Sequence, residues 1–174
     1  MKGITGLLAA AALAVAAAGC ESTAEETTTG GAGKAPAATK PATADNPWKG
    51  TGFAVWDVKG DWYVFLDKAK EMEGFLKTSS LAGAVSRPGT GGAKSLKAPN
   101  AETLDAFAAW KNGFTIRVGK EGRIWVLKEG SKEAAAYDKS GEPEVGVTRV
   151  GAGPGGRTVK APDAATMEAW AAAK

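Results

Sequence analysis

Aromatic side chains cluster in short segments that alternate apolar and polar residues, and they are the first groups in this sequence that could bind a ligand. An exposed tryptophan or tyrosine ring can stack on a sugar ring or pack against a partner protein. Neighbouring side chains on a strand point to opposite faces, so a sheet covered on one face only would expose some of these rings. If helices cover both faces, the rings are core residues instead. The candidate binding residues are Trp56, Trp62, Tyr63 and Trp125.

Basic side chains recur around a later pair of extended segments and form the second candidate site. Arg87 and Arg157 could bind phosphate or carboxylate groups of an acidic polymer, together with neighbouring lysines. The alternative is a solvated sheet edge, where lysine and arginine deter pairing with other sheets. The formal net charge is +3 with both signs interspersed, which lacks the basic stripe of a nucleic-acid-binding protein. We therefore expect no nucleic-acid partner.

The residue types that are missing limit the possible chemistry. The chain has no histidine and a single cysteine, Cys20. Catalysis by Ser-His-Asp, Cys-His or a histidine-ligated zinc is excluded, as is an intramolecular disulfide. We expect no metal, no cofactor and no enzymatic activity. The alternative is a hydrolase that uses paired carboxylates, but Glu71 and Glu133 each lie beside a lysine on a predicted helix and are typical of solvated charges.

A glycine-rich segment, GAGPGG at 151–156, matches the G-x-G-x-x-G pattern of dinucleotide-binding loops. Such a loop needs a helix directly after it, because the free amides of the first helical turn bind the pyrophosphate. Here a predicted strand, RTVKAP, follows. The segment is better explained as a turn that requires positive φ angles.

The N-terminus has the pattern of an export signal. A positive start, Met1-Lys2, precedes an apolar run at 4–18 that is too short to span a bilayer as a mature helix. It ends in Ala17-Ala18-Gly19-Cys20, which resembles the lipobox of bacterial lipoproteins. The resemblance covers residues 1–20 and implies cleavage before Cys20, lipidation of its thiol and, usually, acylation of the new amine. Membrane lipid is then the first partner, bound through acylated Cys20.

Residues 1–19 are accordingly interpreted as the signal peptide and 20–46 as a lipidated, disordered tether. The tether contains no aromatic and no large aliphatic residue, so it cannot bury enough apolar surface to offset its chain entropy. Glu21 after the cysteine, in place of the aspartate associated with inner-membrane retention, favours the outer membrane where one exists. The alternative is an ordinary secretory signal cleaved after an Ala-X-Ala motif.

The remainder of the chain is an internal duplication. KAPNAETLDAFAAW at 97–110 recurs as KAPDAATMEAWAAA at 160–173, and further matches upstream keep the same register. We predict two repeats of about 62 residues, 47–111 and 112–174. Each is a marginal folder at that size, and only Lys111-Asn112 joins them, so they should pack as one pseudo-symmetric domain.

Each repeat reads as β-β-α-β-β-α, an α+β fold. Alternating runs at 52–58 and 61–66 predict a hairpin, and GFTIRVG and RIWVL predict its counterpart around Lys120-Glu121-Gly122. Short helices are expected at 68–77 and 131–138, where Met72, Phe75 and Leu76 have helical spacing. A second extended pair and a closing helix capped by Asn100 or Asp163 follow. The helix faces expected to pack carry Leu104, Phe107 and Ala108, and Met167, Trp170 and Ala171. This membrane-anchored, non-catalytic module would bind an envelope protein or polymer, or serve as a structural element.

Overall fold

The computed structural model describes residues 48–174; the signal peptide, Cys20 and the tether lie outside these residues. The described part belongs to a single compact unit. No helix between 48 and 174 combines the length and apolar character needed to cross a bilayer.

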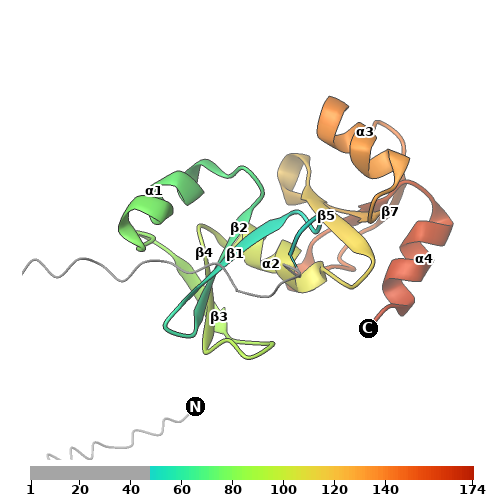
Figure 1. Ribbon diagram of the computed structural model, residues 1–174. Helices are drawn as coiled ribbons and strands as arrows, with labels where there is room; N and C mark the ends of the chain where they lie inside the picture. The colour runs from blue at the N-terminus through green and yellow to red at the C-terminus, as the bar shows by residue number, and fades with distance from the viewer. Residues whose placement is uncertain (1–47) are drawn as a thin grey trace, which may run out of the picture. The chain divides into compact units, whose positions relative to one another are not determined.

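The two repeats have the predicted succession of elements (Figure 1). The first repeat contains β1 (Phe53–Val58), β2 (Asp61–Leu66), α1 (Lys70–Thr78), β3 (Val85–Pro88), β4 (Ser95–Ala98) and α2 (Ala101–Ala109). The second contains β5 (Phe114–Val118), η1 (Lys120–Gly122), β6 (Ile124–Lys128), α3 (Lys132–Ser140), β7 (Val147–Arg149), η2 (Pro154–Gly156), β8 (Val159–Ala161) and α4 (Ala164–Ala172). The predicted duplication and α+β class are confirmed.

Each repeat forms its own four-stranded mixed sheet, with the order β1-β2-β4-β3 in the first and β5-β6-β8-β7 in the second. The outer pairs are antiparallel, with Phe53 opposite Leu66 in the first sheet. The central pair is parallel, with Trp62 opposite Leu96, and the second sheet repeats this with Ile124 opposite Val159. The closing helices α2 and α4 directly follow the central strands β4 and β8.

Side-chain caps begin three of the four helices. The side-chain oxygen Oδ1 of Asn100 accepts from the Thr103 N–H at 2.8 Å, and the Asp163 carboxylate accepts from the Thr166 N–H at 2.7 Å. Both caps were predicted, and each satisfies an amide of the first turn. Ser131 caps α3 in the same way. Helix α1 begins after Ala69 without a side-chain cap and ends one residue later than expected.

Helices cover both faces of each sheet, so the strands bury side chains on both sides. One face of β1 and β2, with Val55 and Val64, faces a core shared by the two repeats and the closing helices. The opposite face packs against Phe75 of α1, and in the second repeat against Ala134 of α3. Consecutive residues are therefore buried at 53–56 and 124–127, since neither face of the strand is left to solvent there.

Two details of the helix faces differ from expectation. Leu76 has helical spacing with Met72, but it is 50 % exposed, because Phe75 is the one residue that α1 buries against its sheet. Ala108 and Ala171 are also exposed. The buried stripe of α2 includes Ala106 and Ala109 instead, because this helix is enclosed by both repeats.

Direct contacts join the repeats. The Ile116 N–H on the edge strand β5 donates to the Thr51 carbonyl oxygen at 2.7 Å. Gly52, with φ +98°, lies so close to this edge that a Cβ atom there would be 2.1 Å from the Ile116 carbonyl oxygen. The Trp170 indole N–H donates to the Ala109 carbonyl oxygen at 2.8 Å. These contacts, with the shared core, make the repeats one pseudo-symmetric domain.

Candidate functional site

An aromatic pocket of about 530 Å³ opens on the first repeat. Its position follows from the sheet order, because β2, β4, β3 and α2 all contribute to it. The apolar lining comes from Trp48, Trp62, Pro88, Gly91, Leu96, Leu104, Phe107, Ala108 and Trp110, and the polar lining from Arg87 and Thr90. A pocket of this size with mostly apolar walls and few polar groups is typical of a binding site.

Trp48 is the centre of the aromatic wall. Its ring centroid lies 4.9 Å from that of Phe107, 5.1 Å from that of Trp110 and 5.8 Å from that of Trp62. The Trp110 and Trp62 contacts are edge-on, an arrangement that aromatic quadrupoles favour. Phe107 is held in turn by Phe53, at 5.3 Å. The wall is therefore fixed before any ligand arrives.

The polar groups of the lining side chains are almost all hydrogen-bond donors. The Trp110 Nε1–H is shielded from water and has no hydrogen-bond partner among the described residues. Arg87 donates a hydrogen bond from Nη2 to Asp105, and its side chain is 37 % exposed. The lining contains no carboxylate or amide side chain, so Thr90 supplies its only side-chain oxygen.

The second repeat carries different side chains at the equivalent positions. Trp170 replaces Phe107, and Ile124 replaces Trp62. The Trp170 ring is 6 % exposed, with its N–H bonded to Ala109 and the Lys111 ammonium 5.0 Å from its centroid. Both residues are thus buried in the shared core, but Phe107 also lines the pocket, whereas Trp170 bonds to the other repeat.

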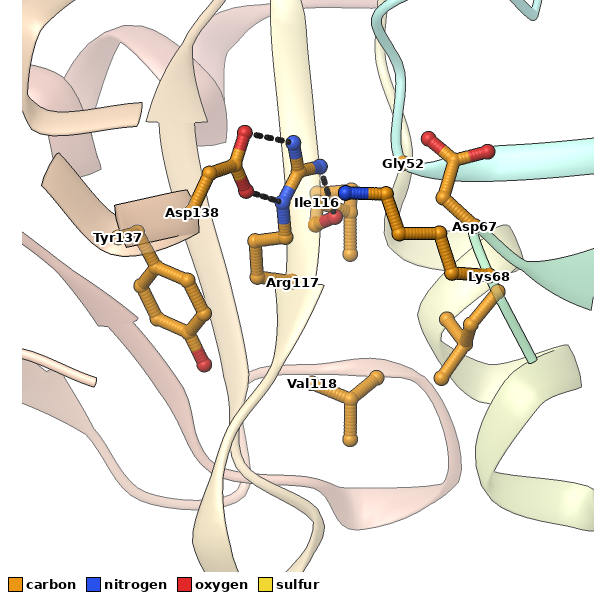
Figure 2. Close-up of a pocket in the computed structure, with 9 residues that line it drawn as sticks. Gly52, Asp67, Lys68, Ile116, Arg117, Val118, Tyr137 and Asp138 are labelled. Carbon is orange, nitrogen blue, oxygen red and sulfur yellow. Dashed lines mark hydrogen bonds and ion pairs between the residues drawn. The ribbon is translucent and has the colours of Figure 1, made fainter. Parts of the chain in front are cut away.

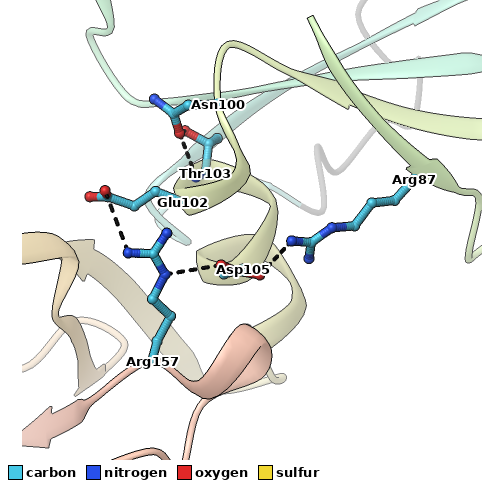
Figure 3. Close-up of polar contacts among 6 residues, drawn as sticks. All are labelled: Arg87, Asn100, Glu102, Thr103, Asp105 and Arg157. Atoms are coloured by element: carbon cyan, nitrogen blue, oxygen red, sulfur yellow. Dashed lines mark hydrogen bonds and ion pairs between the residues drawn. The ribbon is translucent and has the colours of Figure 1, made fainter.

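Arg87 and Arg157, predicted from the sequence as one basic site, do meet (Figure 3). Asp105 of α2 accepts from Arg87 Nη2 at 2.6 Å through Oδ1 and from Arg157 Nε at 3.0 Å through Oδ2. The Glu102 Oε2 atom lies 3.8 Å from Arg157 Nη1. The Asp105 side chain is 4 % exposed, so the two arginines enclose a buried carboxylate, and Arg157 links the repeats. Their charges are balanced locally, which leaves the exposed part of Arg87 as the basic group at the pocket.

Gly155 explains the glycine-rich segment. A Cβ atom at this residue would lie 2.6 Å from the Asp105 carboxylate, and φ is +65°. Gly151 and Gly156 also have positive φ angles. The segment is a turn that lets the backbone approach Asp105, as the turn interpretation predicts.

The other predicted rings lie away from the pocket. Trp56 and Tyr63 pack against Phe75, with Tyr63 stacked at 4.6 Å. Trp125 has no exposed surface and is covered by Tyr137 and by the Lys160 ammonium, 4.6 Å from its centroid. Of the predicted aromatic residues, only Trp62 lines the pocket, together with Arg87.

Sequence reasoning missed Trp48, Phe107 and Trp110 as pocket residues. One signal could have found two of them: the dipeptide Trp48-Lys49 recurs as Trp110-Lys111, two residues before the Gly-Phe of the first repeat and one residue before that of the second. This places a tryptophan at the entrance to each repeat. The contacts of Phe107 and Trp110 with Trp48 depend on the packing of α2 against the sheet, because Phe107 lies on α2 and Trp110 directly follows it.

A second pocket, of about 330 Å³, lies beside β5 and carries two carboxylates, Asp67 and Asp138 (Figure 2). Arg117 donates to both oxygens of Asp138, from Nε at 2.7 Å and from Nη2 at 3.0 Å. This hydrogen bonding lowers the pKa of Asp138, whereas burial raises the pKa of Tyr137. A general acid of a glycoside hydrolase needs a raised carboxyl pKa, so Asp138 is poorly suited to that role.

Glu142 is the most strongly perturbed carboxylate. Burial alone would raise its pKa, but hydrogen bonds from the Lys120 N–H at 2.8 Å and from the Lys160 ammonium at 3.4 Å favour the ionised form, and the pKa is lowered from 4.5 to about 2. Folding therefore favours the ionised form of Glu142. This group holds the start of η1 to the segment after α3.

The acid stability of the protein should depend on Glu142. Because its pKa is lowered in the folded state, its contribution is present above pH 4.5 and is lost as the pH falls toward 2. The contribution is at most about 3 kcal/mol, reduced by solvent that reaches the carboxylate. Urea unfolding between pH 5 and pH 2 should show a shallower loss of stability for Glu142→Gln than for the wild type. Glu144→Gln, an exposed neighbour, is the control; an identical slope in all three proteins would contradict the assignment.

Within residues 48–174, no group of three or more metal-ligating side chains is positioned to hold a metal ion. Comparison with models of protein families, with curated proteins and with solved structures found no match to this chain. The function is therefore argued from the site itself.

Proposed function

We propose that this chain is a membrane-anchored, non-catalytic binding module of the bacterial cell envelope. The aromatic pocket of the first repeat binds the ligand, and acylated Cys20 holds the domain at the membrane through the 20–46 tether. The observation that carries the proposal is the pocket itself. Three tryptophans and Phe107 line an apolar hollow, and the rings of Phe107, Trp110 and Trp62 are already packed against Trp48.

A glycan hydrolase using paired carboxylates is the other candidate from the sequence, and the site geometry favours it less. The aromatic pocket has no carboxylate in its lining. In the second pocket, Asp138 is bound by Arg117, which stabilises its ionised form. Glu142 is likewise stabilised as a carboxylate. A binding role without catalysis needs neither a carboxylate in the aromatic pocket nor a protonated carboxyl group, so it fits these features better.

The anchor is tested at Cys20, the only thiol of the chain. Cys20→Ser should release the protein from the membrane fraction or leave it unprocessed, because stable attachment needs the acyl chains that the thiol and the new amine carry. Fractionation and the apparent mass of the mature protein measure this. Equal membrane retention and equal size of the variant and the wild type would rule out lipidation at this residue.

The binding role is tested by a matched pair of tryptophan substitutions. Ala108 and Ala171 occupy equivalent exposed positions on α2 and α4, but only Ala108 lines the pocket. In the Cys20→Ser background, where lipid cannot hold the chain, Ala108→Trp should reduce sedimentation with isolated cell envelopes to background. Ala171→Trp should sediment like its parent. If the two variants sediment equally, the pocket is not the binding site.

A further inference from the structure

Strand β7 forms the outer edge of the second sheet and is exposed to solvent. It pairs with β8 along one side, and among the described residues no strand pairs with its other side. Thr148 and Arg149 are exposed. Of the three exposed large hydrophobic side chains in residues 48–174, two flank this strand: Val145 is 83 % exposed and Val150 is 86 % exposed. An exposed edge rich in β-branched residues is a surface on which another strand can pair.

The backbone groups of Thr148 point away from β8. An N–H of β6 donates to the Thr158 carbonyl oxygen at 2.9 Å, so Thr158 faces β6 and the next residue, Val159, faces β7. Arg149 lies opposite Val159 and therefore bonds to β8. Residues that bond to the neighbouring strand alternate with residues that face outward. The N–H and C=O of Thr148, and those of Val150, are therefore directed to the open side of the sheet.

The first repeat protects the equivalent edge. Ser86 of β3 corresponds to Thr148, because each lies opposite the equivalent lysine of the neighbouring strand. Two residues further on, β3 ends in Pro88, where the second repeat has Val150. Proline has no N–H to donate and is one of the residues that keep sheet edges from pairing. The second repeat lacks this protection, so its edge is open to a partner strand.

We propose that two copies of this chain pair through β7, antiparallel and about a two-fold axis at Thr148. A two-fold interface brings the same surface of both copies together, so the strand has to be complementary to itself. With the axis at Thr148, the whole strand is paired: Thr148 lies opposite Thr148 of the second copy, and Arg149 lies opposite Val147. The two threonine hydroxyls can hydrogen-bond across the pair. Equal charges do not lie opposite each other.

The residues beside the strand fit the same register. Val150 lies opposite Gly146 of the second copy, which has no side chain to obstruct the exposed valine. These residues exchange hydrogen bonds on either side of the central pair. An axis at Arg149 would place two guanidinium groups opposite each other, and an axis at Val147 would place Val150 opposite the carboxylate of Glu144. The edge is therefore self-complementary in the register centred on Thr148, which favours a second copy as the occupant.

The test of association uses the chain 20–174 with Cys20→Ser, so that neither lipid nor a native thiol is present. A strand pair of this length buries less than the about 1,200 Å² of a stable complex, so the dimer should be reversible. Sedimentation equilibrium should show an average mass that rises with concentration toward that of a dimer. Thr148→Lys places two ammonium groups opposite each other and should keep the protein monomeric. Ser86→Lys, on the protected edge, should associate like its parent.

Cross-linking tests the register. The Cα atoms of a hydrogen-bonded antiparallel pair are about 5.5 Å apart, which is within the range of a disulfide. Thr148→Cys should therefore form a disulfide-linked dimer on mild oxidation, whereas Ser86→Cys should stay monomeric. Val150→Pro copies the proline of the first repeat and removes an outward-facing N–H. Added to Thr148→Cys, it should abolish the cross-link.

Three results would overturn the dimer. The parent chain could stay monomeric at every concentration, the dimer could survive Thr148→Lys, or Thr148→Cys and Ser86→Cys could cross-link equally, as random collision would produce. A monomeric parent that sediments with isolated envelopes, and loses this sedimentation only with Thr148→Lys, would assign the edge to a strand of another protein. The aromatic pocket is tested separately by Ala108→Trp, so the failure of one proposal leaves the other standing.

Discussion

Replacing Trp170 with alanine should lower the free energy of unfolding by about 3–5 kcal/mol, a large fraction of the stability of an ordinary domain. The ring is 6 % exposed, and its N–H donates to Ala109 in the first repeat. The substitution leaves a cavity in the shared core and removes a hydrogen bond between the repeats. Phe107→Ala, at the equivalent position of α2, should cost a similar amount. Denaturant unfolding monitored by circular dichroism measures both.

The shape of the transition matters as much as its midpoint. Because the core includes Phe107, Ile116 and Trp170 from both repeats, each variant should unfold in one cooperative transition over residues 48–174. Trp170→Phe keeps a ring but removes the hydrogen bond to Ala109 and part of the ring volume, and the lost hydrogen bond should add about 1 kcal/mol to the cost of the lost volume. Two separate transitions, each shifted by one substitution, would mean that the repeats are independent domains.

Local patterns in the sequence predicted the elements well. Alternation located the strands of the first hairpin, predicted at 52–58 and 61–66 and found at 53–58 and 61–66, and the caps Asn100 and Asp163 located the closing helices. These signals are local, since they depend on residues within one turn or one strand pair. The strand order could not be predicted, because the parallel pairing of Trp62 with Leu96 joins segments more than thirty residues apart. The sequence of neither segment specifies that β2 pairs with β4, because this pairing also depends on how the helices pack on the sheet.

The residues of the aromatic pocket were likewise only partly predictable from local sequence patterns. Trp62 and Arg87 were identified by residue type, but exposure decides which rings can bind, and exposure depends on tertiary packing. Trp125 resembles Tyr63 and Trp62 in sequence context, yet α3 covers it completely. Conversely, Phe107 was expected only as a core residue, and it is both core and pocket wall. Duplication conceals the difference, since equivalent residues have different surroundings in the two repeats.

Asp105 is the clearest case of this divergence. Its counterpart in the second repeat is Glu168, which is exposed, as a polar residue on a short amphipathic helix normally is. Asp105 is buried because the second repeat packs over α2, bringing Gly155 against the carboxylate and Arg157 onto Oδ2. No pattern within α2 distinguishes the two positions. The contrast makes them a matched pair for experiment.

Asp105→Ala should therefore destabilise the protein by about 3 kcal/mol, whereas Glu168→Ala should change its stability by less than about 0.5 kcal/mol. Removing Asp105 leaves Arg87 and Arg157 facing each other without a shared carboxylate. The cost is at the lower end of the range for a broken buried ion pair, because the arginine side chains are 37 % and 28 % exposed and water can solvate them.

A second measurement separates the role of the charge from that of packing. The loss from Asp105→Ala should shrink when Arg157 is first replaced by alanine, because the two side chains interact directly; the double-mutant cycle gives this coupling energy. Asp105→Ala should also loosen Arg87 and weaken ligand binding at the pocket, an effect that Glu168→Ala should not produce. If Asp105→Ala and Glu168→Ala cost the same, the buried carboxylate does not hold the repeats together, and the packing of η2 on α2 must rest on its apolar contacts alone.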